Sequence, residues 1–242
     1  MTEAYEPVSY WSTRLAQNFN LRGVGHIEYG PGYNDWLYRQ KRIALDRALP
    51  GRAAGSVALD VGSGIGWVVA YLLDRGFRVT GCDIAELSVE RLAEQYPAAN
   101  FFQLAAGSET IPREDESFDV ITMIDVAYHI VDSELWRAAV AEMGRVLKPD
   151  GQIVITDGLG SESSRRAEHV EQRSLHEWSE AARTAGLRVA RVGPLFTWLS
   201  RPHGIRGWRR IPNTARGALE FGLERILPLA PHMRWAVLVK AD

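Results

Sequence analysis

The sequence Val57-Ala-Leu-Asp-Val-Gly-Ser-Gly-Ile-Gly-Trp67, followed by a helical run and by Phe77-Arg-Val-Thr-Gly-Cys-Asp83, decides the fold of this chain. Its order is an apolar strand, a glycine turn, a helix and a second strand that ends in a carboxylate, which is the layout of a nucleoside-binding βαβ unit. Glycines 62, 64 and 66 carry no Cβ, so the backbone can turn tightly there and approach a ligand closely. The stretch therefore predicts a binding loop for a nucleoside cofactor.

The composition of the chain is that of a folded α/β protein with little net charge. Its 242 residues are 46% hydrophobic and 24% charged, enough for one α/β domain with additions. A net charge of −2 gives no basic field, so we expect no nucleic-acid partner. No apolar run approaches the roughly 20 residues of a membrane span, and the start of the chain lacks the regions of a signal peptide. We expect a cytoplasmic protein without an internal disulfide, because Cys82 is its single cysteine.

Strands and helices alternate along most of the chain. Residues 1–34 are rich in aromatic residues but show no sustained helical or strand spacing of apolar residues, so we expect an irregular arm. Asn34 or Asp35 is placed to cap a helix that continues to about Leu49. This alternation favours a doubly wound, mostly parallel sheet with helices on both faces, in which ligands bind at the carboxyl ends of the strands. The hydrophobic pattern predicts strands at 57–61, 77–82, 100–104, 118–124, 152–156, 187–192 and 235–240, and helices at 67–75, 85–96, 133–147 and 174–186.

Four motifs of the chain, taken in order, resemble those of class I S-adenosylmethionine-dependent methyltransferases. They are the loop from Asp60 to Gly66, Asp83, the sequence Ser117-Phe-Asp-Val120 and the sequence Arg145-Val-Leu-Lys-Pro-Asp-Gly151. The resemblance covers about residues 35–193 and implies a Rossmann-like seven-stranded sheet whose last strand is antiparallel. It divides a single methyltransferase domain, residues 1–242, into an aromatic arm at 1–34, a cofactor-binding core at 35–193, a lid between strands six and seven at 194–233, and the last strand at 234–242.

A glycine loop also occurs, with a different spacing, in dinucleotide-binding dehydrogenases. Their fingerprint has its third glycine at the place that Trp67 occupies here, and a tryptophan is too large for close packing of a helix on a strand. The third glycine of this chain falls at Gly66 instead, as in the methyltransferase pattern. The spacing therefore favours S-adenosylmethionine over a dinucleotide.

The resemblance implies how the core contacts S-adenosylmethionine. The backbone of the glycine loop lies against the methionine part, Asp60 orients the loop, and Asp83 accepts hydrogen bonds from both ribose hydroxyls. After strand three the family commonly has an acidic residue for the adenine amino group, whereas this chain has Ala105-Ala-Gly-Ser-Glu109. We expect backbone groups of Ala105 and Ala106 to meet the adenine, with Ser108 or Glu109 as the alternative. The expected cofactor contacts are Asp60, Gly62, Ser63, Gly64, Gly66, Asp83, Ile84, Ala105, Ala106 and Asp125.

His129 is the candidate general base. It follows strand four, where many small-molecule members of the family have a histidine near the acceptor, and an ordinary histidine pKa of about 6.5 suits proton removal at neutral pH. The alternative is that His129 caps the following loop or only shapes the pocket. Asp125 and Asp157, after strands four and five, are further catalytic candidates that contact the cofactor ammonium or the substrate. Metal-dependent members hold magnesium with such carboxylates, but Gly158 stands where they have an asparagine, so we expect no metal.

The parts outside the resemblance are expected to select the acceptor. Five arginines between positions 201 and 216 suit a carboxylate or phosphate on the acceptor, or an acidic partner protein. The alternative is a solvated rim that pairs with Glu220 and Glu224. The arm and the lid are predicted to enclose the acceptor, with substrate contacts from Tyr29, Tyr33, Tyr128, Arg206 and Trp208.

The whole pattern predicts transfer of a methyl group from S-adenosylmethionine to an oxygen or nitrogen of a small-molecule acceptor, such as a specialised metabolite. One alternative is a peptide or protein methyltransferase, and another is a scaffold that binds the cofactor without catalysis. The intact glycine loop and Asp83 favour catalysis, because a binder that has lost its reaction has no reason to keep a cofactor site.

Overall fold

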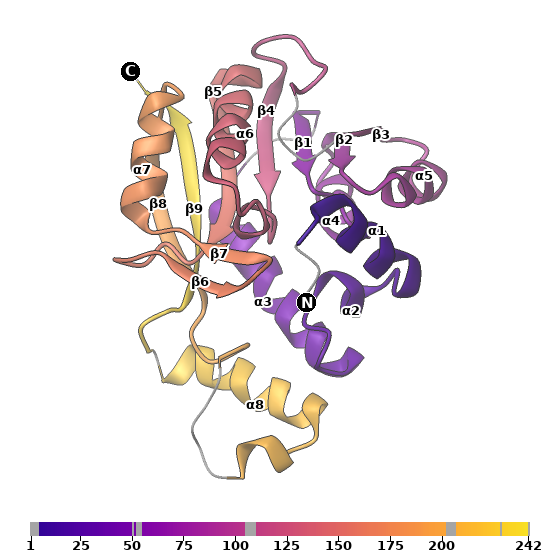
Figure 1. Ribbon diagram of the computed structural model, residues 1–242, viewed down its shortest axis with the longest axis vertical. Helices are drawn as coiled ribbons and strands as arrows, with labels where there is room; N and C mark the ends of the chain where they lie inside the picture. The colour runs from indigo at the N-terminus through magenta and orange to yellow at the C-terminus, as the bar shows by residue number, and fades with distance from the viewer. Residues whose placement is uncertain are drawn as a thin grey trace.

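The computed structural model describes residues 5–49, 51, 55–104, 110–201, 207–227 and 229–241. Its main sheet consists of β1 (Val57–Val61), β2 (Arg78–Asp83), β3 (Asn100–Gln103), β4 (Phe118–Met123), β5 (Leu147–Asp157), β8 (Leu187–Phe196) and β9 (Met233–Lys240). The seven strands lie in the order β3-β2-β1-β4-β5-β9-β8 (Figure 1). β1 to β5 pair in parallel, and β9 is antiparallel to both β5 and β8. The predicted Rossmann-like sheet with an antiparallel last strand is confirmed.

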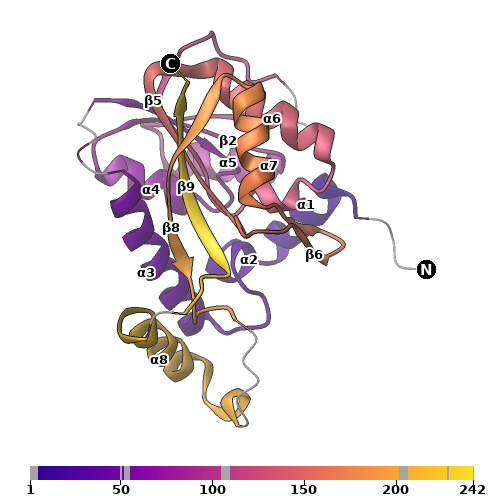
Figure 2. The ribbon, with the colours of Figure 1, turned by 90° about the vertical axis from the view of Figure 1, so that its left-hand side faces the viewer.

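Helices cover both faces of this sheet. One face carries α3 (Pro31–Ala48) and α4 (Trp67–Asp74), and the other carries α6 (Ser133–Val146) and α7 (Leu175–Thr184), as Figure 2 shows. α5 (Glu86–Gln95) connects β2 to β3. On the α6–α7 side, the buried indole rings of Trp136 and Trp178 meet edge to face with centroids 5.0 Å apart.

The central strands are apolar on both sides because both sides are buried. Leu59 of β1 and Ile121 of β4 belong to the core under α6 and α7, whereas their neighbours Ala58 and Val120 belong to the core under α3 and α4. All four side chains are fully buried. The alternation has the period of two expected for a strand, and it explains why the apolar runs in the sequence are continuous.

The glycine loop connects β1 to α4 through residues in the left-handed region of backbone space. The φ angles of Gly62, Gly64 and Gly66 are 75°, 54° and 80°, which other residues rarely adopt. The amides of Gly62 and Ser63 both donate to the carbonyl oxygen of Cys82, at 2.8 and 2.9 Å. The loop is thereby held against the end of β2.

The N-terminal arm differs from the irregular segment that the sequence predicts. It contains the helices α1 (Pro7–Gln17) and α2 (Leu21–Val24), and α3 begins at Pro31, before the predicted caps Asn34 and Asp35. A proline in the first turn is a favourable start because its missing N–H needs no partner there. The buried side chain of Asn34 instead bonds the loop before the helix, accepting from the amide of His26 and donating to its carbonyl oxygen.

Two further segments extend beyond the expected pattern. A hairpin of β6 (Ser164–Ala167) and β7 (Val170–Gln172) follows β5, where the sequence predicts neither strand. Its strands are short and polar and therefore lack the apolar alternation of a core strand. Between β8 and β9, α8 (Asn213–Ile226) lies beyond the end of α3, at one end of the molecule (Figures 1 and 2). The rings of Phe221 on α8 and Trp36 on α3 are 5.0 Å apart.

None of the helices in the described ranges is long and apolar enough to cross a membrane.

Candidate active site

A cavity of about 280 Å³ opens at the carboxyl ends of β1, β2 and β4. The position is the one expected for a ligand site in a doubly wound sheet. From the core, it is lined by Val61, Gly62, Ser63, Gly64, Ile65, Trp67, Val68, Cys82, Asp83, Ile84, Leu104, Ile124, Asp125, Val126, His129, Ile130, Val131, Asp132 and Leu135. From the arm and α3, it is lined by Tyr5, Pro7, Trp11, Leu15, Val24, Tyr38 and Lys41.

Asp83 joins the end of β2 to the glycine loop. Its Oδ2 accepts a hydrogen bond from the amide of Gly64 at 2.7 Å, and its Oδ1 accepts one from the amide of Ala85 at 2.9 Å. Burial raises the pKa of the carboxyl group, against the lowering effect of these amide donors. Each oxygen has a second lone pair, so the carboxylate can still accept bonds from a ligand's hydroxyls.

At Gly62 and Gly64 the loop lies too close to other segments for a side chain. A Cβ on Gly64 would lie 2.9 Å from Cγ1 of Val24 in the arm, and a Cβ on Gly62 would lie 2.3 Å from Cγ2 of Val126. These approaches are tighter than ordinary van der Waals contact. The loop is therefore the kind of cradle that a nucleoside cofactor with an amino-acid group requires.

Asp60 lies behind the loop and does not line the cavity. Its Oδ1 accepts from the hydroxyl of Thr122 at 2.7 Å, its backbone oxygen accepts from Ser63 Oγ at 3.1 Å, and its Oδ2 is buried without a hydrogen-bond partner among the described residues. Burial raises the pKa of this carboxyl group to about 7. Asp60 thus fastens the base of the loop, while Ser63 belongs to the cavity wall. Gly66 also lies outside the lining; a Cβ there would meet Leu92 at 2.5 Å, so it serves packing.

Lys41 is a residue of the cavity that the sequence reasoning missed. Its ammonium group pairs with Asp125 Oδ2 and lies 3.7 Å from the centroid of the Tyr38 ring. Asp125, with a φ of 60°, follows β4, and its Oδ1 accepts from Thr156 Oγ1 at 3.1 Å. A lysine is usually exposed, and this one stands between two exposed arginines, so the sequence gives no direct sign that it is buried. The only hint is its helical spacing from the apolar residues Leu37 and Ala44, which share the buried face of α3.

His129 lies in the short helix η1 (Ala127–His129) and lines the cavity. Its Nδ1 is 2.7 Å from the carbonyl oxygen of His169, in the turn of the β6–β7 hairpin. Because a carbonyl oxygen only accepts, Nδ1 carries the proton and Nε2 keeps its lone pair. Burial lowers the pKa of His129 to about 4, so the ring is neutral at neutral pH and much less basic than the ordinary value suggests.

Asp157 lies outside the cavity, although it ends β5 as expected. Its Oδ2 accepts from the indole N–H of Trp178 at 2.9 Å, and its Oδ1 accepts from the amides of Gly158 and Arg173 at 2.6 and 3.2 Å. The side chain is fully buried, and burial raises its pKa to about 6. These contacts give Asp157 a structural place under the hairpin.

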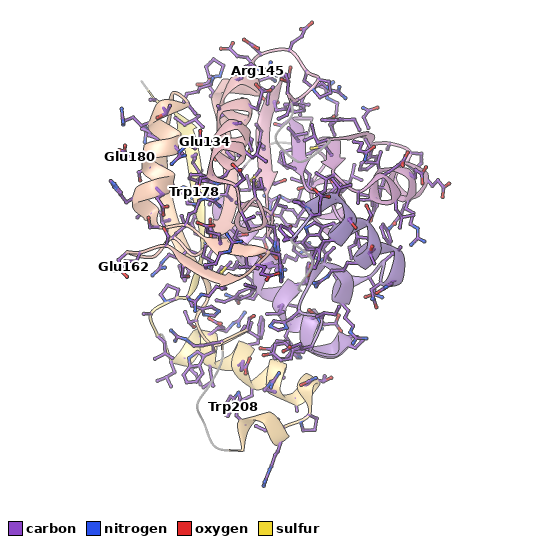
Figure 3. All side chains as sticks on the ribbon, in the orientation of Figure 1. Glu134, Arg145, Glu162, Trp178, Glu180 and Trp208 are labelled. Atoms are coloured by element: carbon purple, nitrogen blue, oxygen red, sulfur yellow. The ribbon has the colours of Figure 1, made fainter. Side chains whose placement is uncertain are left out.

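The predicted substrate residues lie outside the cavity lining wherever the structure describes them. The rings of Tyr29 and Tyr33 lie 4.3 Å apart between α3 and α8, and the Tyr33 hydroxyl donates to Glu220. Trp208, in η2 (Trp208–Arg210), donates to Glu220 at 2.8 Å, at the α8 end of the molecule (Figure 3). Tyr128 packs in the core under α3 and α4.

The predicted contacts Ala105, Ala106 and Arg206 lie outside the described residues. Of the other predicted residues, the structure brings together Gly62, Ser63, Gly64, Asp83, Ile84, Asp125 and His129 around one cavity.

Carboxylates, histidines and the cysteine are the side chains from which a metal site would be built. Within the ranges that the structure describes, no three such side chains are placed to hold a metal ion. Asp125 is paired with Lys41, and Asp157 is surrounded by N–H donors.

Comparison with known proteins agrees with this geometry. Residues 59–155 match the family model described as a methyltransferase domain. The chain is 28% identical over 166 residues to a probable S-adenosylmethionine-dependent methyltransferase of Mycolicibacterium smegmatis, covering 66% of this chain and 62% of that protein. It is 32% identical over 171 residues to the glycine/sarcosine/dimethylglycine N-methyltransferase of Actinopolyspora halophila, covering 66% of this chain and 30% of that protein. In both cases the match spans less than two thirds of the relative's own length.

A solved structure shares the fold along the whole chain. It is the 1,6-didemethyltoxoflavin-N1-methyltransferase of Burkholderia thailandensis, with bound 1,6-didemethyltoxoflavin and S-adenosylhomocysteine. The TM-score is 0.59 at 18% identity, with 100% of this chain and 94% of that chain covered. Sequence match, sheet order and glycine loop agree, and the chain belongs to the class I S-adenosylmethionine-dependent methyltransferase family.

Proposed function

We propose that this protein transfers a methyl group from S-adenosylmethionine to an oxygen or nitrogen of a small-molecule acceptor, of the kind found among specialised metabolites. The observation that carries the proposal is that one cavity contains both the glycine loop with Asp83 and the neutral imidazole of His129. A cofactor site and a candidate acceptor site are thus continuous.

The order of the strands supports one direction for a bound cofactor. Asp83 ends β2, the glycine loop follows β1, and Asp125 follows β4, and these three strands are neighbours. A cofactor whose ribose hydroxyls donate to Asp83 therefore extends across the loop toward Asp125 and Lys41. There the ion pair meets the ammonium and carboxylate groups of the methionine part.

When bound, S-adenosylmethionine supplies a methyl group that is already activated by its sulfonium. The protein then has to align the acceptor atom with that methyl group and keep water away, which accounts for much of the rate in such displacements. The arm supplies this cover, because Tyr5, Trp11 and Leu15 line the cavity opposite the strand ends. His129 accepts the hydrogen bond of the acceptor's O–H or N–H group through Nε2.

The cover that the arm gives the cavity supports a small acceptor over a peptide. A protein substrate needs an open groove for its chain on both sides of the modified residue, whereas here Pro7, Trp11 and Leu15 of α1 line the cavity, and Tyr5, just before α1, is bonded to its wall. The hydroxyl of Tyr5 donates to the backbone oxygen of His129 at 3.3 Å. The relative from Actinopolyspora halophila, whose name states small amine substrates, supports the same choice.

The proposal is tested first on the cofactor and then on the acceptor. Calorimetry should show that S-adenosylmethionine and S-adenosylhomocysteine bind the protein, that Asp83→Ala abolishes binding, and that Asp115→Ala, at an exposed carboxylate, leaves it unchanged. Incubation with methyl-labelled cofactor and a panel of small hydroxyl and amine compounds should then release S-adenosylhomocysteine and a labelled product. Binding without transfer to any compound would support a scaffold, and label in added proteins would support a protein methyltransferase.

A further inference from the structure

Aromatic rings from the N-terminal arm and from the β6–β7 hairpin surround His129. Trp11 of α1 meets the imidazole edge to face at 4.8 Å between centroids, and His169 of the hairpin lies parallel to it at 5.6 Å and 6°. Tyr10 stacks on His169 at 5.0 Å, and Tyr5 meets Tyr10 edge to face at 5.5 Å. We call these five side chains the aromatic cluster. Tyr5, Trp11 and His129 line the cavity, and Tyr10 and His169 pack behind them, so the aromatic part of the wall is preorganised.

The arm holds this cluster by polar contacts outside the cavity. Arg14 of α1 donates to the hydroxyl of Tyr10 at 2.8 Å and to the backbone oxygen of Gly25 at 2.8 Å. Its guanidinium also lies 5.3 Å from the ring centroid of Trp11. The charge of Arg14 is therefore engaged by the arm itself, and Arg14 does not line the cavity.

In the described part of the chain, each charged side chain that lines the cavity already has a hydrogen-bond or ion-pair partner in the protein. Among the described residues of the lining, Lys41 is the one lysine or arginine, and it is paired with Asp125. Asp83 accepts hydrogen bonds from two backbone amides and is the residue expected to bind the ribose. Asp132 caps α6, because it accepts hydrogen bonds from the amides of residues 134 and 135. This part of the chain thus offers no cation to neutralise a carboxylate or phosphate. Burying such a group unpaired is costly.

Around His129 the remaining lining is apolar apart from the exposed Asp132, whose carboxylate caps α6. Ile130, Val131 and Leu135 follow it along the chain, and Pro7 and Leu15 face the cavity from α1. The Nδ1–H of His129 is used by the carbonyl of His169, so the imidazole offers a ligand one acceptor, Nε2, and no donor. A ligand that fits these groups carries one O–H or N–H hydrogen and an apolar body.

We propose that the acceptor is an uncharged, planar aromatic or heteroaromatic molecule that donates one O–H or N–H hydrogen bond to His129 Nε2. Rings are favoured over saturated bodies of equal size because aromatic walls add edge-to-face and stacking attraction to the burial of apolar area. This inference rests on the proposed methyl transfer. It also assigns the aromatic cluster, and not the arginines near α8, as the part that selects the acceptor.

The transfer balances with these groups. A bond forms between the acceptor oxygen or nitrogen and the methyl carbon as the bond between carbon and sulfur breaks, and its electron pair stays on sulfur. The proton of the acceptor passes to His129 Nε2 and from there to water. The weak basicity of the buried imidazole favours that release.

Matched probes test the inference on protein saturated with S-adenosylhomocysteine. We expect 2-naphthol and indole to bind, by calorimetry, at least tenfold more tightly than 2-naphthoate, 2-naphthyl phosphate and the saturated alcohol 2-decalol. Trp11→Leu should weaken 2-naphthol about fivefold or more, whereas Trp36→Leu, at the α3–α8 contact outside the cavity, should leave it unchanged. His129→Asn should weaken 2-naphthol binding, because it removes the Nε2 acceptor, and should lose methyl transfer to whichever probe is methylated.

The possible results distinguish a wrong acceptor class from a wrong proposed function. Equal or tighter binding of an anionic or saturated probe, or no binding of either neutral aromatic probe, would overturn the acceptor class while the cofactor still bound. Failure of S-adenosylhomocysteine to bind would overturn the proposed function itself.

Discussion

Lys41 and Asp125 form an ion pair that joins the middle of α3 to the end of β4 beside the cavity. Their side chains are 4% and 16% exposed. Burial lowers the pKa of Lys41, but the charge of Asp125 and the hydroxyl of Tyr38 outweigh it, so the pKa is raised and the ammonium group stays charged. A pair of opposite charges in this place complements the carboxylate and ammonium of a bound methionine group.

Replacing Lys41 by Met should therefore weaken the binding of S-adenosylhomocysteine at least about tenfold, or about 1.4 kcal/mol. The binding of 5′-methylthioadenosine, which lacks the ammonium and carboxylate, should not change. Calorimetry with both ligands checks this, and Lys148→Met, at the more exposed pair with Asp119, is the control. An equal loss for the two ligands would mean that the variant had disturbed the cavity instead of one contact.

Replacing Gly64 by Ala should abolish cofactor binding, because its φ of 54° is strained for a residue with a Cβ and that Cβ would lie 2.9 Å from Val24. Gly186→Ala is a matched control: its φ is 68°, but no atom lies within 4 Å of the added Cβ. Both variants should lose about 1 kcal/mol of stability from backbone strain. Only the first should lose affinity for S-adenosylhomocysteine, and equal affinities in the two variants would contradict the close approach at the loop.

The protonation of His129 should show no change between pH 5 and 8. Its pKa is lowered from 6.5 to about 4, so its contribution to the free energy of unfolding is fully present above pH 6.5 and is lost as the pH falls toward 4. Nitrogen-15 NMR should show the Nδ1–H tautomer throughout that range. On going from pH 7 to pH 4.5, the wild-type protein should lose more stability than His129→Asn, and a titration of His129 near pH 6.5 would refute the buried neutral state.

Arg216 should matter for stability and not for the cofactor. Its buried guanidinium lies 4.4 and 5.0 Å from the ring centroids of Tyr29 and Tyr33, and its Nε is 3.8 Å from Glu220 Oε1. Arg216→Met should lower the free energy of unfolding by about 2 kcal/mol, because it removes a buried guanidinium from between two tyrosine rings and a buried carboxylate. Chemical denaturation measures the loss, and calorimetry should show unchanged affinity for S-adenosylhomocysteine. Unchanged stability together with weaker binding of S-adenosylhomocysteine would mean that Arg216 contributes to the cofactor site.

The part of the site next to the strands follows from the sequence because it is local. The loop from Gly62 to Gly66 and the carboxylate of Asp83 lie within one βαβ unit, and the spacing of the glycines determines their geometry. The position of Asp157 at a strand end was predicted in the same way. The direction of its side chain depends on Trp178 and Arg173, which are distant in the sequence, and only the folded structure places them.

The rest of the site depends on how distant segments pack. Lys41 stands in the sequence Arg39-Gln-Lys-Arg42, where nothing distinguishes the buried cation from its exposed neighbours. The sequence of the arm predicts no helix, because its aromatic residues contact several distant segments and so show no regular hydrophobic spacing. Likewise, the sequence predicts a lid at residues 194–233, and that its α8 packs on α3 is seen only in the folded structure.

Val24 of the arm lies close enough to Gly64 to exclude a side chain there, while the aromatic cluster connects the same arm to the hairpin. The expected cofactor loop and the proposed acceptor surface therefore meet at the arm. Residues 5–17 could be replaced by those of a relative, or diversified in a library, without altering the βαβ unit. In such a fold, new substrate preferences can arise at the N-terminus while use of the methyl donor is inherited unchanged.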